Sequence, residues 1–266
     1  MTNPHRSGRS LGLPRDQLSG PHVLEFGSRA ALHVQSEVLQ GALVAVRSSR
    51  GVAAFDLDST VLSNKIRQAR IVRELGAERG DARLQACPPE AIISWDLRDS
   101  LRLCGLSAEE ATALFPAAKD FWRDRFFTSD YCRDDEPVPG AARYLATVLE
   151  QGGRILYLTG RHTEMGPGTI ESFRRGGFPL PDGKQVDLWL KPAFADDDDA
   201  FKVLSHEKLV GMGGIAAAFD NEPTHVNAYK SAFPHAFVVH LDTDHSGRPV
   251  SVLDSIPSVA DFTMEG

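Results

Sequence analysis

The stretch Val52-Ala53-Ala54-Phe55-Asp56-Leu57-Asp58-Ser59-Thr60 decides how the rest of this sequence is interpreted. Its first four residues are an apolar run without polar alternation, which is typical of a strand buried on both faces of a sheet. Two carboxylates, Asp56 and Asp58, follow at the end of that strand. Buried carboxylates are costly unless a metal ion or a cationic side chain lies beside them. A structural alternative stays open, because Asp58 and Ser59 are also residue types that cap a following helix.

The composition is that of an ordinary globular protein. The 266 residues include 42% apolar and 24% charged side chains, enough for one large domain or for a core with an insert. The net charge is -7 and no basic block is present, so nucleic acid is not an expected partner. No apolar run is long enough to span a bilayer, so no membrane partner is expected either. The polar start lacks an apolar signal core, and we expect a cytoplasmic protein.

The three cysteines, Cys87, Cys104 and Cys132, do not have the spacing of metal ligands. An odd number of cysteines in a chain of this length is typical of reduced, structural thiols in the cytosol. We therefore expect all three to be reduced.

The pattern outside the opening stretch alternates between strands and helices. Residues 1–27 are typical of a loosely held arm, and residues 29–46 have the apolar spacing of an amphipathic helix. Further strands are expected at 154–158, 186–190, 215–219 and 236–241, separated by helices at 141–151, 168–175, 200–210 and 224–232. This alternation predicts an α/β fold with a parallel sheet and right-handed crossovers.

Between residues 64 and 136 the sequence predicts helices only. Ser107 and Glu110 have the spacing of a capping box, and Pro88 with Pro89 suits a first helical turn. We therefore divide the chain into an N-terminal arm and helix (1–50), an α/β core (51–63 and 137–266) and an all-helical insert (64–136).

Polar side chains follow the predicted strands. Asp56 and Asp58 follow the first strand, Thr159 the second, and Asp220 with Glu222 the fourth. Ligands of an open parallel sheet bind beyond the carboxyl ends of its strands, so these side chains are expected on one rim. Their carboxylate oxygens suit Mg²⁺. One carboxylate can act as a nucleophile and a second can carry a proton, while a hydroxyl and a lysine can bind a phosphoryl group in transit.

The order of these motifs, DxDST, then TGR after an apolar run, then a lysine, then DNE after an apolar run, resembles the haloacid dehalogenase superfamily. The resemblance covers about residues 51–241 and implies a Rossmann-like parallel sheet core. It implies that Asp56 is the nucleophile, forming an aspartyl-phosphate, and that Asp58 is the general acid/base. Thr159 and a lysine would bind the phosphoryl oxygens. Mg²⁺ would be held by Asp56, the main-chain carbonyl of Asp58 and Asp220.

The second aspartate narrows the reaction that the resemblance implies. In this superfamily, DxD marks phosphatases and phosphomutases rather than dehalogenases. A leaving alkoxide needs a proton, which Asp58 would supply, so we expect a raised pKa for Asp58 beside an ionised Asp56. The helical insert lies where the superfamily has a C1-type cap, which closes over the site and selects small substrates.

Several site assignments stay open. Lys202, which opens a helix shortly before Asp220, is favoured over Lys191 as the phosphate-binding lysine. Glu222 would bind the metal directly, through water, or not at all. Gly160 and Arg161 lie beside Thr159 and are candidate substrate contacts.

Three further groups of residues have a structural interpretation beside a functional one. Arg67 is a candidate substrate contact, although a solvated basic helix face is favoured. The run Asp196–Asp199 is interpreted as a solvated anion cluster at a helix N-terminus. The aromatic residues of the insert are interpreted as its core rather than as a stacking platform; they are Trp95, Trp122, Phe126 and Phe127.

We therefore expect a Mg²⁺-dependent phosphatase that acts on a small phosphorylated metabolite. A phosphomutase or phosphotransferase would share every motif. A non-catalytic module that binds Mg²⁺ or phosphate is the alternative from a different class, but such a module has no need of Asp58. A receiver-like signalling domain would be much shorter and would lack the insert.

Overall fold

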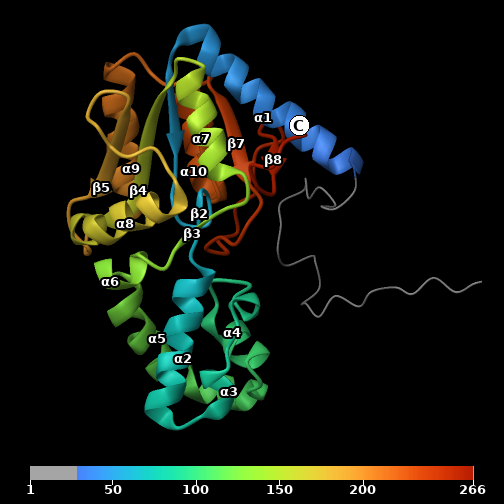
Figure 1. The fold of residues 1–266 in the computed structure, drawn as a ribbon, viewed down its shortest axis with the longest axis vertical. Coiled ribbons are helices and arrows are strands. Elements are labelled where there is room, and N and C mark those ends of the chain that lie inside the picture. The colour runs from blue at the N-terminus through green and yellow to red at the C-terminus, as the bar shows by residue number, and fades with distance from the viewer. Residues whose placement is uncertain (1–28, 266) are drawn as a thin grey trace, which may run out of the picture.

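The computed structural model describes residues 29–265, in which a parallel sheet carries helices on both faces and a helical unit extends from one end (Figure 1). The arm expected at residues 1–27 lies outside the described residues. The sheet has the order β5-β4-β1-β6-β7-β8, and every neighbouring pair is parallel. Its strands are β1 (Val52–Phe55), β4 (Arg154–His162), β5 (Val186–Lys191), β6 (Ala217–Asp220), β7 (Phe237–Leu241) and β8 (Ser258–Val259). The predicted α/β fold with a Rossmann-like parallel sheet is confirmed, and β8 is an addition that the sequence did not indicate.

The central strand β1 explains why the motifs meet. Phe55, its last residue, is paired with Tyr157 of β4 and with Phe219 of β6. The residues that follow these three partners therefore lie side by side, where β1 and β6 end and β4 continues to His162. All three strands are buried on both faces, as the unalternating apolar runs predict.

Helices cover both faces of the sheet because successive strand residues point to opposite sides. These helices are α1 (Arg29–Ser49), α7 (Ala141–Glu150), α8 (Gly166–Gly176), α9 (Asp198–Gly211) and α10 (Pro223–Ala232). Phe55 and Tyr157 pack in one apolar cluster with residues of α1, α7 and α8. Ala54 and Leu158 point the other way and pack with residues of α9 and α10. The sheet is thus the middle of three layers.

The segment from residue 64 to residue 136 is helical and has an apolar cluster of its own. Its helices are α2 (Lys65–Arg79), α3 (Ala82–Gln85), η2 (Pro89–Ala91), α4 (Leu97–Leu103), α5 (Ala108–Phe126) and α6 (Ser129–Cys132). A short antiparallel pair, β2 (Leu62–Ser63) with β3 (Glu136–Pro137), joins the segment to the sheet. We call residues 64–136 the helical insert. The division of the chain into a core and a separate insert domain stays a prediction.

One detail of the insert agrees with expectation and one differs. The capping box of Ser107 and Glu110 is present, and it begins α5, which runs through Pro116 to Phe126. Its continuation keeps both Ala111 and Ala118 in the apolar cluster of the insert, which offsets the hydrogen bond that proline cannot make. The helix expected at Pro88 and Pro89 is a single 3-10 turn.

The expectation of three reduced cysteines is wrong for two of them. Cys87 and Cys104 form a disulfide, and Cys132 is free and buried. The turns around α3 and α4 bring together two thiols that are 17 positions apart in the sequence, which an odd cysteine count does not reveal. The disulfide removes the support that reduced cysteines would give to a cytoplasmic location. That location stays a prediction. Among the described residues, no helix is both long and apolar enough to cross a membrane.

Candidate active site

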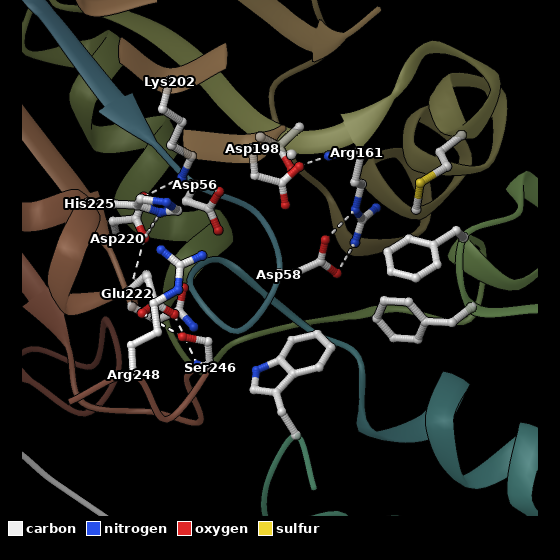
Figure 2. Close-up of a pocket in the computed structure, with 17 residues that line it drawn as sticks. Asp56, Asp58, Arg161, Asp198, Lys202, Asp220, Glu222, His225, Ser246 and Arg248 are labelled. Carbon is white, nitrogen blue, oxygen red and sulfur yellow. Dashed lines mark hydrogen bonds and ion pairs between the residues drawn. The ribbon is translucent and has the colours of Figure 1, made fainter. Parts of the chain in front are cut away.

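The opening stretch ends at a pocket of about 350 Å³ between the carboxyl ends of the strands and the helical insert (Figure 2). The Asp56 main-chain N–H donates to the carbonyl of Phe219, which continues the sheet by one residue beyond β1. The chain then turns sharply: the Leu57 carbonyl accepts from the N–H groups of Thr60, Val61 and Leu62. No helix starts here, since α2 begins at Lys65, so the helix-cap interpretation of Asp58 and Ser59 is wrong.

Asp56 and Asp220 share one ammonium group. Lys202 Nζ donates to Asp56 Oδ1 at 2.9 Å and to Asp220 Oδ2 at 2.5 Å. All three side chains are almost completely buried. Burial, with the charge of Asp220 added, raises the pKa of Asp56 to about 7 against the opposing charge of Lys202. For Asp220 the charges of Lys202 and His225 outweigh burial and hold its pKa below the ordinary value.

The two candidate lysines point to different places. Lys191 Nζ donates to Asp198 Oδ1 at 2.7 Å and to the carbonyls of Phe194 and Asp196. It lies at the end of β5, and its ammonium is occupied by the loop that leads into α9. Lys202 is therefore the lysine beside Asp56, the placement that the sequence favoured.

Asp58 points toward Arg161, as Figure 2 shows. It accepts from Arg161 Nε at 2.8 Å and Nη2 at 2.8 Å, and from Arg67 Nη2 at 2.5 Å. Burial alone would raise the pKa of Asp58, but the charges of Arg161 and Arg67 hold it well below its ordinary value. The expected raised pKa is thus wrong for this arrangement. The expectation rested on repulsion between two neighbouring carboxylates. In the structure Asp56 pairs with Lys202, and Asp58 pairs with Arg161 and Arg67.

A fourth charged group, Asp135, completes this cluster. Its carboxylate lies 3.0 Å from Arg67 Nε and accepts from Arg161 Nη2 at 2.5 Å. Burial raises the pKa of Asp135 to about 6, although both arginines oppose the shift. Sequence reasoning missed this residue, because in the run DDEP it looks like part of a solvated linker. We call Asp58, Arg67, Asp135 and Arg161 the four-charge cluster.

The candidate substrate contact of Arg67 requires correction. Its side chain has no exposed surface, and it does not line the pocket. Besides the two aspartates, it donates to the Phe126 carbonyl at 3.0 Å, and its guanidinium lies 3.8 Å from the centre of the Phe126 ring. The interpretation as a solvated basic helix face is equally wrong, because α2 turns Arg67 inward between the insert and the sheet.

The TGR motif lines the pocket. Thr159 is buried, and its Oγ1 accepts from the main-chain N–H of Arg161 at 3.2 Å. Gly160 leaves room for a close neighbour, because a Cβ there would lie 2.8 Å from Asp198 Oδ2. Asp198 itself lines the pocket and pairs with Lys191. The structure thus brings Thr159, Gly160 and Arg161 to the same pocket as Asp56.

The acidic run before α9 is more than a solvated cluster. Asp197 caps α9 by accepting from Ala200 N at 2.8 Å, in keeping with the dipole argument. Asp199, however, accepts from Arg248 Nη1 at 2.6 Å and lies 2.9 Å from His225 Nε2. His225 Nδ1 lies 3.4 Å from Asp220 Oδ1, so the run is linked to the centre of the site.

Glu222 is held on the other side of the pocket. Its carboxylate accepts from Ser246 Oγ at 2.8 Å and from Ser246 N at 2.9 Å. In this arrangement both of its oxygens are engaged by the loop that follows β7. Sequence reasoning missed His225, Ser246 and Arg248. His225 had a signal, since it follows the DNE motif in the first turn of α10, but the loop residues had none.

The donor set fits a hard divalent cation. Within residues 29–265 no three His, Cys, Asp or Glu side chains gather closely enough to hold a metal by themselves. A metal beside Asp56 and Asp220 would need main-chain or water oxygens as well as their carboxylates, and such oxygen ligands suit Mg²⁺. Burial is the main cause of the raised pKa of Asp56, and a cation bound beside its carboxylate would favour the ionised form.

Comparisons with known proteins give similarity to solved structures only. No protein-family model and no curated protein matches the chain. Protein Tyrosine Kinase A from Mycobacterium tuberculosis is 18% identical over 79% of this chain and 93% of its own, with a TM-score of 0.47. CbbY from Rhodobacter sphaeroides in complex with phosphate is 15% identical over 80% and 94%, with a TM-score of 0.46. A haloacid dehalogenase-like family hydrolase from Streptococcus pneumoniae is 13% identical over 75% and 90%, with a TM-score of 0.41.

Proposed function

We propose that this chain is a Mg²⁺-dependent phosphatase of the haloacid dehalogenase type that hydrolyses a small phosphomonoester through an aspartyl-phosphate. One observation carries the proposal. The carboxylate of Asp56 lies at the carboxyl end of the central strand, with Lys202 Nζ at 2.9 Å, in a pocket that Thr159 and Asp58 also line. A nucleophile, a cation, a hydroxyl and a second carboxylate are the groups that phosphoryl transfer through a covalent intermediate requires.

The first step uses Asp56 as the nucleophile. One oxygen of its carboxylate bonds to phosphorus while the bond between phosphorus and the leaving oxygen breaks. Lys202 and the Thr159 hydroxyl bind the phosphoryl oxygens and stabilise the charge that develops on them. The leaving oxygen takes a proton from Asp58.

In the second step, water attacks the phosphorus of the aspartyl-phosphate. Asp58 takes a proton from that water, Asp56 is released as a carboxylate, and inorganic phosphate leaves. The ionised form in which Arg67 and Arg161 hold Asp58 is the form that this second step needs. For the first step Asp58 has to be protonated, which requires weaker contact with the two arginines.

A divalent metal would be held by Asp56, the Asp58 carbonyl and Asp220. When bound, Mg²⁺ would neutralise charge on the phosphoryl oxygens and keep Asp56 ionised. Glu222 stays outside this set while Ser246 engages both of its oxygens.

Hydrolysis of an aryl phosphate by the purified full chain tests the proposal. We expect turnover with Mg²⁺ and its loss on addition of EDTA. Asp56→Asn should abolish turnover while its unfolding curve shows a folded protein. Near wild-type turnover by folded Asp56→Asn would reject the nucleophile, and turnover that is insensitive to EDTA would reject the metal. Adding an alcohol to the assay separates hydrolysis from phosphoryl transfer, because a transferase would form the alcohol's phosphate ester.

A further inference from the structure

The helical insert contributes a wall of rings to the pocket. In the described structure three side chains of the insert line the pocket, and all three are aromatic: Trp95, Phe126 and Phe127. The polar lining comes from the core, that is, from the ends of β1, β4 and β6 and from α9, α10 and the loop after β7. The pocket therefore has a charged floor and an aromatic wall, supplied by different parts of the chain.

The rings of the wall are held by contacts with one another. Phe126 is only 2% exposed, and Trp95 and Phe127 pack edge-to-face against it, with ring centres 5.5 Å and 5.0 Å away. Behind it, Trp122 stacks on Phe126 at 4.3 Å, and the guanidinium of Arg67 lies 3.8 Å from the Phe126 ring centre. Trp95 and Phe127 are only partly buried, so they present some ring surface that a ligand can cover. The interpretation of these residues as insert core alone is therefore incomplete.

The aromatic surface continues onto the core. Phe194, in the loop between β5 and α9, packs against Phe127 with ring centres 5.0 Å apart. It is 47% exposed and lies 5.6 Å from the ring of His162. An exposed phenylalanine beside the wall widens the apolar surface that borders the site.

The insert adds no positive charge to this pocket among the described residues. Its nearest arginine, Arg67, is fully buried and paired with Asp58 and Asp135. The arginines that do line the pocket, Arg161 and Arg248, come from the core and are paired with carboxylates. The insert side of the pocket thus lacks the cations that a second phosphate would require, and its rings favour a flat apolar group.

We propose that the substrate is a phosphomonoester whose leaving group carries an aromatic ring, which packs against Trp95 and Phe127 while the phosphoryl group lies at Asp56. The placement of the phosphoryl group rests on the proposed function. The choice of leaving group rests on the wall alone. Contacts between aromatic rings supply affinity beyond the apolar area that they bury.

Binding of three phosphonates tests the inference without any need for turnover. Calorimetry on the full chain with Mg²⁺ compares methylphosphonate, cyclohexylmethylphosphonate and benzylphosphonate, which share the charged group and do not hydrolyse. We expect benzylphosphonate to bind about tenfold more tightly than methylphosphonate, with the cyclohexyl compound between them. Equal binding of all three would overturn the inference and leave the phosphatase proposal standing. Binding of none would overturn the phosphate site and the inference with it.

Variants of the wall residues test whether these rings cause the preference for benzylphosphonate. Trp95→Leu and Phe127→Leu should each remove most of the benzylphosphonate advantage and leave methylphosphonate affinity unchanged. Phe121→Leu is the matched control, because Phe121 packs in the insert and under the Arg125 guanidinium and does not line this pocket. It should keep the full preference. If both wall variants kept the preference as well, the rings would not be the binding surface.

Discussion

Arg67 of α2 and Asp58 of the loop after β1 form an ion pair of 2.5 Å that joins the helical insert to the core of the chain. Arg161 from β4 holds the same carboxylate, and Asp135 bridges the two arginines from the segment that returns to the sheet. The four-charge cluster therefore connects both crossings between insert and core. Its two positive and two negative groups balance, which is the condition for burying so many charges together.

The first prediction concerns removal of Arg67. Arg67→Met leaves Asp135 buried with one partner fewer, and breaking a buried charge pair costs about 3–5 kcal/mol. We expect urea unfolding to show a loss of that order. Arg70→Met, on the same helix, is the control, because Arg70 is 36% exposed in its pairs with Glu74 and Asp134. Exposed pairs contribute about 0–1 kcal/mol. Equal losses in the two variants would contradict a structural role of the four-charge cluster.

The second prediction separates proton transfer from binding. Asp58→Asn keeps an oxygen that can accept from Arg161 but cannot carry a proton. We expect turnover of an aryl phosphate to fall by about 10²–10⁴, while methylphosphonate binding measured by calorimetry stays close to that of the wild type. Asp135→Asn alters the same four-charge cluster without touching the pocket and should lower stability more than turnover. Unchanged turnover in Asp58→Asn would remove its acid/base role.

The parts of the site that the sequence predicted share one property: each directly follows an apolar run that shows no alternation. Asp56 comes just after β1, Thr159 lies within β4 and Asp220 ends β6, and parallel pairing of β1 with β4 and β6 brings these positions together. Local pattern and sheet topology together therefore suffice to place them. The preference for Lys202 over Lys191 came instead from the family resemblance, because Lys202 precedes Asp220 by 18 residues, the place where the superfamily usually has its lysine.

The parts that the sequence did not predict depend on side-chain direction or on loops. Spacing shows that Asp58 lies near Asp56 but not that Arg67 and Arg161 turn inward to meet it, and this decides the sign of its pKa shift. Asp135 and Ser246 reach the site from segments without periodicity. Helical periodicity places Trp95 and Phe127 in the insert but does not distinguish a ring in the core from a ring at its edge.

The third prediction compares the two lysines. Lys202→Met removes the cation shared by Asp56 and Asp220, and we expect aryl phosphate turnover to fall by about 10²-fold or more. Lys191→Met is the matched control, since Lys191 is also buried and also paired with an aspartate, but its ammonium faces the loop before α9. That variant should lose stability and keep turnover. The reverse outcome would assign the phosphate-binding role to Lys191.

The last prediction concerns the pH dependence of stability. His206 of α9 is buried, and its ring lies 4.2 Å from that of Tyr229. Within the described chain, its Nε2 has no hydrogen-bond partner. Burial, helped by the charge of Lys202, lowers the pKa of His206 from 6.5 to about 4. The unfolded chain therefore binds this proton at a higher pH than the native chain does. The contribution of His206 to stability is therefore fully present above pH 6.5 and is lost as the pH falls toward 4.

Replacing His206 with phenylalanine should remove its share of that decrease. The shift corresponds to at most about 3 kcal/mol between the two ends of the window. His206→Phe keeps the ring against Tyr229 and eliminates both the proton and the unpaired nitrogen. We expect its urea midpoint to change less between pH 7 and pH 4.5 than that of the wild type, with the difference appearing at the acid end. His240, whose pKa burial also lowers to about 4, is present in both proteins and cancels. If the urea midpoints of the two proteins changed in parallel with pH, the lowered pKa of His206 would be contradicted. His206 would then be protonated in the native state, or water would reach its site.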